Sequence, residues 1–133
     1  MKTNSFSLSI TVACSAQDLF SALTQTRAIA AWSGQSGKFQ PTIGGSMELF
    51  DGWVTGVVLA YEPGKRLSFT WKPSDWKKED RASLVTCRLL STRSGSKLLL
   101  RHSGFPSTNE LRSHKDGWKE FVFNPLKAYL TSA

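Results

Sequence analysis

The 133-residue sequence is poor in the residues that build covalently or metal-stabilised folds. Its two cysteines, Cys14 and Cys87, lie far apart and form no CxxC motif, and its two histidines, His102 and His114, are isolated. A disulfide framework and a zinc site are therefore not expected, and we predict no metal ligand and no cofactor. A reducing compartment is the default for a chain of this kind.

The sequence also lacks a long apolar run. No stretch approaches the length of a membrane-spanning helix, so membrane insertion is not expected. The apolar residues that precede Cys14 alternate with small polar residues, which is typical of a strand and not of the apolar core of a signal peptide. We therefore predict a cytoplasmic protein.

Motifs for nucleotide binding and hydrolysis are missing as well. There is no P-loop and no GxGxxG, and the stretch nearest to a nucleophile elbow, Gly-Gln-Ser-Gly at 34–37, is interpreted as a loop. His102 is either a hydrogen-bonded structural histidine or a polar contact at the mouth of a cavity. His114 is expected on the exposed face of the last helix. We predict that the protein is not an enzyme.

Acidic residues are scarce compared with basic ones. The chain has 17 lysines and arginines against 10 acidic residues, a net charge of +7, and the excess lies beyond Asp51. We favour solubility as the reason for this charge, and the alternative is an acidic partner surface or an anionic ligand. Nucleic-acid binding is not expected, because the basic residues are scattered and no reader motif accompanies them.

What the sequence does contain is regular alternation of apolar and polar residues. This alternation and the turn signals between the runs predict antiparallel strands over 5–12, 38–39, 47–50, 54–61, 66–72, 81–90 and 97–102. The Asp51-Gly52 pair is a strong signal for a two-residue hairpin.

Helical spacing follows the first strand and closes the chain. Two short helices are predicted after residue 15, the first capped by Ser15 and the second carrying Trp32. A long C-terminal helix is predicted to begin after Ser107 and to bend at Pro125, which lacks a backbone donor.

Together these elements predict one α+β domain over 1–133. We expect a curved antiparallel sheet of about six to seven strands wrapped around the long helix, with the two short helices at one end. This arrangement often leaves a cavity between sheet and helix. We predict a monomer.

Several short motifs resemble one protein family in their order and spacing. They are Trp32 with Phe39, Gly44-Gly45, Gly56 to Val58, Pro63 with Arg66-Leu67, Phe69-Thr70-Trp71, His102-Ser103-Gly104 and Gly117-Trp118. Together they resemble the activator of Hsp90 ATPase homologue-like family of the SRPBCC group. The resemblance implies the helix-grip (START/Bet v 1-like) fold and an Hsp90-type chaperone as a partner.

Apolar residues from several predicted elements are expected to converge on the cavity. The expected lining residues are Phe39, Met47, Leu49, Trp71, Val85, Phe121, Val122 and Tyr129. The expected polar contacts are Tyr61, Thr86 and His102. An ordinary aromatic core is the alternative explanation for Trp71 and Trp118.

A second candidate surface surrounds a turn. Trp53 follows Gly52 and is expected to be exposed near Trp76, Lys77 and Lys78. An exposed tryptophan beside lysines is typical of a protein-binding anchor.

We favour a non-catalytic binding domain for a hydrophobic or lipid-like small molecule. The alternative is a co-chaperone-like protein that binds an Hsp90-type ATPase. A cyclase or hydrolase of the SRPBCC group ranks third, because it needs a convergent acid–base pair that cannot be assembled from this sequence.

Overall fold

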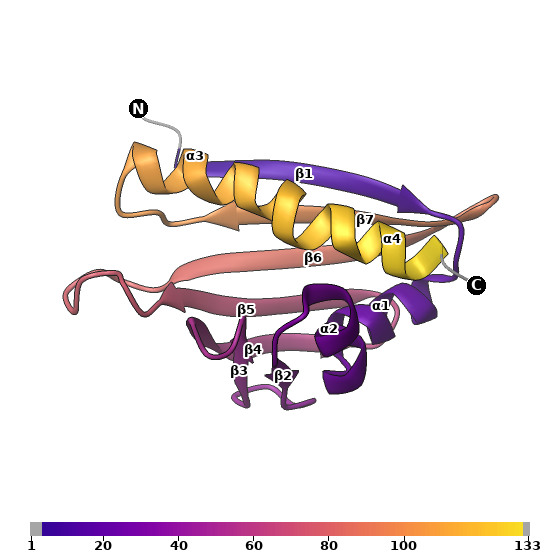
Figure 1. The fold of residues 1–133 in the computed structure, drawn as a ribbon, viewed down its shortest axis with the longest axis horizontal. Helices are drawn as coiled ribbons and strands as arrows, with labels where there is room; N and C mark the ends of the chain where they lie inside the picture. The colour runs from indigo at the N-terminus through magenta and orange to yellow at the C-terminus, as the bar shows by residue number, and fades with distance from the viewer. Residues whose placement is uncertain (1–3, 132–133) are drawn as a thin grey trace.

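The computed structural model describes residues 4–131 as a seven-stranded antiparallel sheet with the C-terminal helix lying across it (Figure 1). The strands are β1 (Ser5–Val12), β2 (Lys38–Phe39), β3 (Ser46–Leu49), β4 (Val54–Glu62), β5 (Arg66–Pro73), β6 (Ser83–Thr92) and β7 (Gly95–Ser103). The helices are α1 (Ala16–Thr24), α2 (Thr26–Ser33), α3 (Thr108–Gly117) and α4 (Asn124–Thr131), with a π-helical turn, η1 (Trp118–Phe123), joining α3 to α4. The predicted antiparallel sheet, two short helices and long C-terminal helix are confirmed.

The strand order and the alternation of side chains show which face of the sheet the helix covers. It runs β1-β7-β6-β5-β4-β3-β2, so β1 pairs with the last strand and the remaining strands pair in chain order. In β7, Leu98, Leu100 and His102 are buried on the helix side, whereas Arg101 is exposed on the other side. This period of two leaves the sheet with one apolar face for the helix to cover.

The two short helices lie at the end of the sheet near the C-terminus (Figure 1). Ser15 caps α1, since its hydroxyl oxygen accepts a hydrogen bond from the Asp18 amide at 3.0 Å. The Trp32 indole of α2 donates to the Ala22 carbonyl at 2.8 Å and ties α2 to α1. Leu19 and Ile29 are fully buried, so both helices contribute to the core.

The C-terminal helix is irregular close to the predicted position. The sequence predicts a bend at Pro125, and the structure places the π-helical turn η1 directly before this proline. Within it the Asn124 amide bonds to the Lys119 carbonyl, five residues back. The extra residue of such a turn shifts the inward-facing stripe of the helix by one position, and π turns are frequent at functional sites.

Gly56 marks a close approach of two strands. A Cβ at this position would overlap the backbone carbonyl oxygen of Thr70 on the neighbouring strand. We expect Gly56→Ala to lower the free energy of unfolding by about 3 kcal/mol, because backbone cannot move aside as a flexible side chain does. Urea denaturation measures this change. Thr55→Ala, at an exposed neighbouring position, is the control, and equal losses from the two variants would contradict the expectation.

Candidate functional site

A cavity of about 400 Å³ lies between the C-terminal helix and one end of the sheet. Its walls come from α3 and η1, from β5, from the turn between β3 and β4, and from the loop between β5 and β6. The lining residues are Gln35, Phe50, Trp53, Trp71, Asp75, Glu110, Ser113, His114, Gly117, Trp118, Phe121 and Val122. A largely aromatic pocket with a few polar groups is typical of small-molecule sites.

Aromatic rings form both the floor and the rim of this cavity. Trp71 and Trp118 are buried, with ring centroids 5.2 Å apart. Trp53 and Phe121 are at the rim, where they are 39% and 58% exposed. Trp53 stands at 83° to Trp71, with centroids 6.3 Å apart, so the two indoles form adjoining walls.

The turn between β3 and β4 has an unusual backbone. The sequence predicts a two-residue hairpin at Asp51-Gly52, but Phe50, Asp51 and Gly52 all have positive φ, at 55°, 57° and 84°. A left-handed phenylalanine is strained, and it persists only where its surroundings hold it. Asp51 is held by Ser36, whose amide donates to the carboxylate at 2.7 Å and whose carbonyl accepts from the Asp51 amide at 3.0 Å. The turn thereby fixes two walls of the cavity, Phe50 and Trp53.

A directed hydrogen-bond chain lies beneath the floor. The Trp118 indole donates to His102 Nδ1 at 2.9 Å, so Nε2 carries the imidazole proton and donates to the Ser83 hydroxyl at 2.8 Å. Ser83 in turn donates to the Trp71 carbonyl at 2.7 Å. His102 is fully buried, and this burial, together with nearby His114, lowers its pKa to about 2. The ring is therefore neutral.

His114 lies in the cavity wall with a second chain of the same kind. Trp71 donates its indole N–H to His114 Nε2 at 3.1 Å, which leaves Nδ1 to donate to the Glu110 carbonyl at 2.9 Å. Burial lowers the pKa of His114, although its hydrogen bond to the Glu110 backbone and the charges of Glu110 and Asp75 oppose the shift. His114 is buried, so its predicted exposure on the last helix is wrong.

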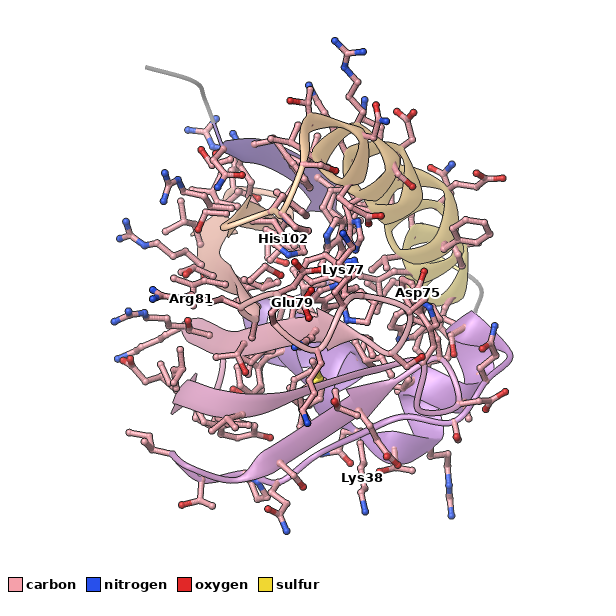
Figure 2. The ribbon with its side chains drawn as sticks, turned by 90° about the vertical axis from the view of Figure 1, so that its left-hand side faces the viewer. Lys38, Asp75, Lys77, Glu79, Arg81 and His102 are labelled. Atoms are coloured by element: carbon pink, nitrogen blue, oxygen red, sulfur yellow. The ribbon has the colours of Figure 1, made fainter. Side chains whose placement is uncertain are left out.

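Two carboxylates are held at the cavity by indole donors. Trp53 donates to Asp75 Oδ1 at 3.1 Å, and Trp76 donates to Glu110 Oε1 at 3.0 Å. Asp75 lies on the side of the C-terminal helix, and the loop then runs past Lys77 toward Arg81 on the opposite side (Figure 2). Of this loop, the end that carries Asp75 therefore lies at the cavity.

The structure brings only part of the predicted cavity lining together. Trp71, Phe121 and Val122 line the cavity. The other five predicted residues are elsewhere: Met47, Leu49 and Val85 are buried in the core, Phe39 packs on Phe69, and Tyr129 is 38% exposed on α4.

None of the three predicted polar contacts lines the cavity. Tyr61 packs edge-on against Phe20, with centroids 5.1 Å apart. Thr86 faces away, into a hollow on the other side of the sheet that it shares with Arg88 and Arg101. His102 lies under the floor, with Trp71 and Trp118 against it.

The predicted partner surface is also divided. Trp53 is exposed at the cavity rim, and Lys77 and Lys78 are exposed on the adjoining loop. Trp76 is only 8% exposed and its indole donates to Glu110, so it is not part of the surface.

Sequence reasoning missed Phe50, Asp75, Glu110, Ser113 and Gly117 as lining residues. Only the helical spacing of 110, 113 and 117 with Phe121 would have signalled three of them.

Residues 4–131 contain neither a cluster of metal-binding side chains nor a membrane-spanning helix. This part of the chain has no group of three or more His, Cys, Asp or Glu side chains placed to hold a metal ion. None of its helices is long and apolar enough to cross a membrane.

The fold identifies the class of protein. A sheet curved around a long C-terminal helix, with two short helices at one end, is the helix-grip (START/Bet v 1-like) architecture. The chain belongs to the family described as "Activator of Hsp90 ATPase homolog 1-like protein", whose sequence profile matches residues 13–131. The resemblance drawn from the sequence motifs is thus confirmed.

Three relatives illustrate the family. The "Activator of 90 kDa heat shock protein ATPase homolog" of Dictyostelium discoideum is 21% identical over 114 residues, which are 86% of this chain and 30% of that protein. The chain thus spans less than a third of this curated relative. An HSP90 activator from Plasmodium falciparum has a TM-score of 0.86 and 25% identity over 96% of each chain. A protein from Mesorhizobium loti has a TM-score of 0.81 and 29% identity, over 97% of this chain and 99% of that one.

The two histidines predict how stability depends on pH. Their pKa values in the fold lie below the ordinary 6.5, so below that pH the unfolded chain binds more protons than the folded one. The free energy of unfolding has its full value above about pH 6.5 and decreases as the pH falls. Proton uptake by His102 on unfolding alone lowers it by about 1.4 kcal/mol per pH unit.

Urea denaturation at several pH values between about 6.5 and 5 tests this dependence, in a range where carboxylates titrate little. In His114→Gln the amide oxygen still accepts from Trp71, so this variant should fold and lose stability less steeply than the unaltered protein as the pH falls. A free energy of unfolding that stays constant over this range would show that both histidines bind protons in the fold as they do in the unfolded chain, which contradicts the lowered pKa values.

Proposed function

We propose that this chain is a non-catalytic binding domain for a hydrophobic small molecule, held in the cavity between the C-terminal helix and the sheet. The observation that carries this proposal is the aromatic cavity of about 400 Å³, with Trp53 and Phe121 exposed at its rim. Exposed aromatic rings around a hollow favour an apolar ligand, because burying them removes large apolar surfaces from water.

The state of the histidines favours binding over catalysis. Both ring nitrogens of His102 and both of His114 are engaged with protein groups. Burial lowers the pKa of both rings, that of His102 to about 2, whereas general acid–base catalysis favours a pKa near the working pH. The two rings thus serve to hold the floor of the cavity in place.

Gly117 offers a way to fill the cavity without disturbing the core. It has helical backbone angles, φ −62° and ψ −40°, and an added Cβ would meet only the Phe121 ring, at 3.9 Å. We expect Gly117→Leu to fold at least as stably as the unaltered protein, since leucine favours a helix over glycine by about 0.5–1 kcal/mol. Its side chain should occupy the ligand volume and weaken binding by about tenfold or more.

Amide-shift NMR with a library of small lipids, aromatic compounds and polyketides measures this binding. Ligand-induced shifts should cluster at Trp71, Trp118 and Phe121 and should weaken in Gly117→Leu. Gly117→Ala is the matched control, because it has the same helical benefit with little added volume. Unchanged binding to Gly117→Leu would place the ligand elsewhere and reject this cavity.

The second candidate function is binding of an Hsp90-type chaperone. The comparisons favour it, since a Plasmodium falciparum relative of similar extent is described as an HSP90 activator. The exposed Trp53 and the exposed Lys77 and Lys78 next to it support a surface for an acidic partner. This candidate uses the outside of the cavity rim and not its interior.

A charge reversal separates this surface from the general basicity of the chain. Lys77→Glu should weaken chaperone binding at low salt by about threefold or more, whereas Lys38→Glu makes the same change in net charge at a distant position (Figure 2). Titration followed by NMR line broadening at Trp53 measures the effect. If the chaperone does not bind at low salt, or if both variants weaken it equally, this surface is not the docking site.

A further inference from the structure

The cavity carries the opposite charge to the rest of the chain. The chain has 17 basic residues and 10 acidic ones. The described residues that line the cavity include Asp75 and Glu110 but no lysine or arginine. His114, the remaining titratable lining residue, is held neutral by burial. A pocket lined by one sign of charge within apolar walls attracts the opposite charge, so this cavity favours a cation.

The aromatic walls of the cavity also favour a cation. The planes of the Trp53 and Trp71 rings are nearly perpendicular, at 83°, and Phe50 lies against Trp53 with centroids 6.3 Å apart. One face of Trp53 stacks on His114, with centroids 6.1 Å apart. The π face of an aromatic ring carries partial negative charge, and it attracts an ammonium group placed within about 6 Å. Trp53 is 39% exposed and Trp71 only 3%, so Trp53 offers the larger ring surface to a bound group.

The two carboxylates are oriented and have bonding capacity left. Asp75 accepts from Trp53, and Glu110 accepts from Trp76 through Oε1, which also lies 3.5 Å from His114 Nδ1. An ionised carboxylate has about four acceptor positions, so each retains room for a ligand N–H. Because the indoles already fix these side chains, little further side-chain entropy is lost when a ligand binds.

We propose that the ligand of this cavity is a hydrophobic organic cation, an amine or quaternary ammonium whose apolar body packs on the tryptophans and whose charge lies near Asp75 and Glu110. This inference rests on the proposed small-molecule binding function and names the chemical class of the ligand. The aromatic faces bind the apolar body, and the two acids select its charged end.

Three probes with closely similar alkyl chains and different charge test the proposal: octylamine, octanol and octanoate. At neutral pH they are cationic, neutral and anionic. Octylamine should bind to the cavity about tenfold more tightly than octanol, and octanoate more weakly than either, as measured by tryptophan fluorescence and by amide-shift NMR. Added salt should weaken octylamine binding and leave octanol binding nearly unchanged.

Isosteric variants remove each charge but keep an oxygen to accept the indole N–H. Asp75→Asn and Glu110→Gln should each weaken octylamine binding by about threefold to fivefold and leave octanol binding unaltered. The matched controls are Glu79→Gln in the loop that carries Asp75 and Glu120→Gln in η1, which follows α3. Both are exposed residues outside the cavity lining, and both variants lose the same charge.

The outcomes distinguish this proposal from the binding function on which it rests. An octylamine preference that is smaller in Asp75→Asn and in Glu110→Gln, but not in the controls, supports the cation site. Equal binding of octylamine and octanol at the cavity, or equal losses in variants and controls, overturns the cation site while the binding function stands. If none of the three probes shifts the resonances of Trp71 and Phe121, the cation site fails; the binding function fails only if the library of lipids, aromatic compounds and polyketides also leaves these resonances unchanged.

Discussion

The buried hydrogen bond from the Trp118 indole to His102 is the interaction on which the cavity depends. It joins the C-terminal helix to β7 under the cavity floor, at 2.9 Å. An indole only donates, so this bond decides which imidazole nitrogen carries the proton and, through it, that Ser83 donates to the Trp71 carbonyl. Losing the acceptor would leave a buried N–H unpaired, at a cost of about 1–3 kcal/mol.

The other indoles around the cavity are also held by hydrogen bonds. Trp71 donates to His114, Trp76 to Glu110 and Trp53 to Asp75, so each of these indoles has an acceptor. Fully paired polar networks fix the orientation of their members. A ring held in this way cannot turn to fill the space beside it, because turning would break its hydrogen bond. This explains how a cavity persists among side chains that would otherwise pack together.

The sequence was sufficient for the elements of the fold and insufficient for the pairing of their side chains. Alternation placed Val85 on the helix side, and the same alternation puts Thr86 on the opposite side, so assigning both to one cavity was an error that strand parity could have prevented. The burial of His114 has a different cause. Its partner Trp71 is 43 residues away, and no local pattern reports a contact at that separation.

Fold membership does not decide what the cavity holds, because the fold supplies only the space between sheet and helix. The chemistry comes from the turn at Phe50 and Asp51, the loop at Asp75 and the inward face of α3. The strained turn is the clearest sign. Left-handed non-glycine residues cost about 1–3 kcal/mol each, and an ordinary core needs no such turn. Here the hydrogen bonds between Ser36 and Asp51 hold the strained turn, and the turn places Phe50 and Trp53 in the cavity wall. The side chains that we propose define the ligand therefore lie where the chain departs from the conformation that packing alone would select.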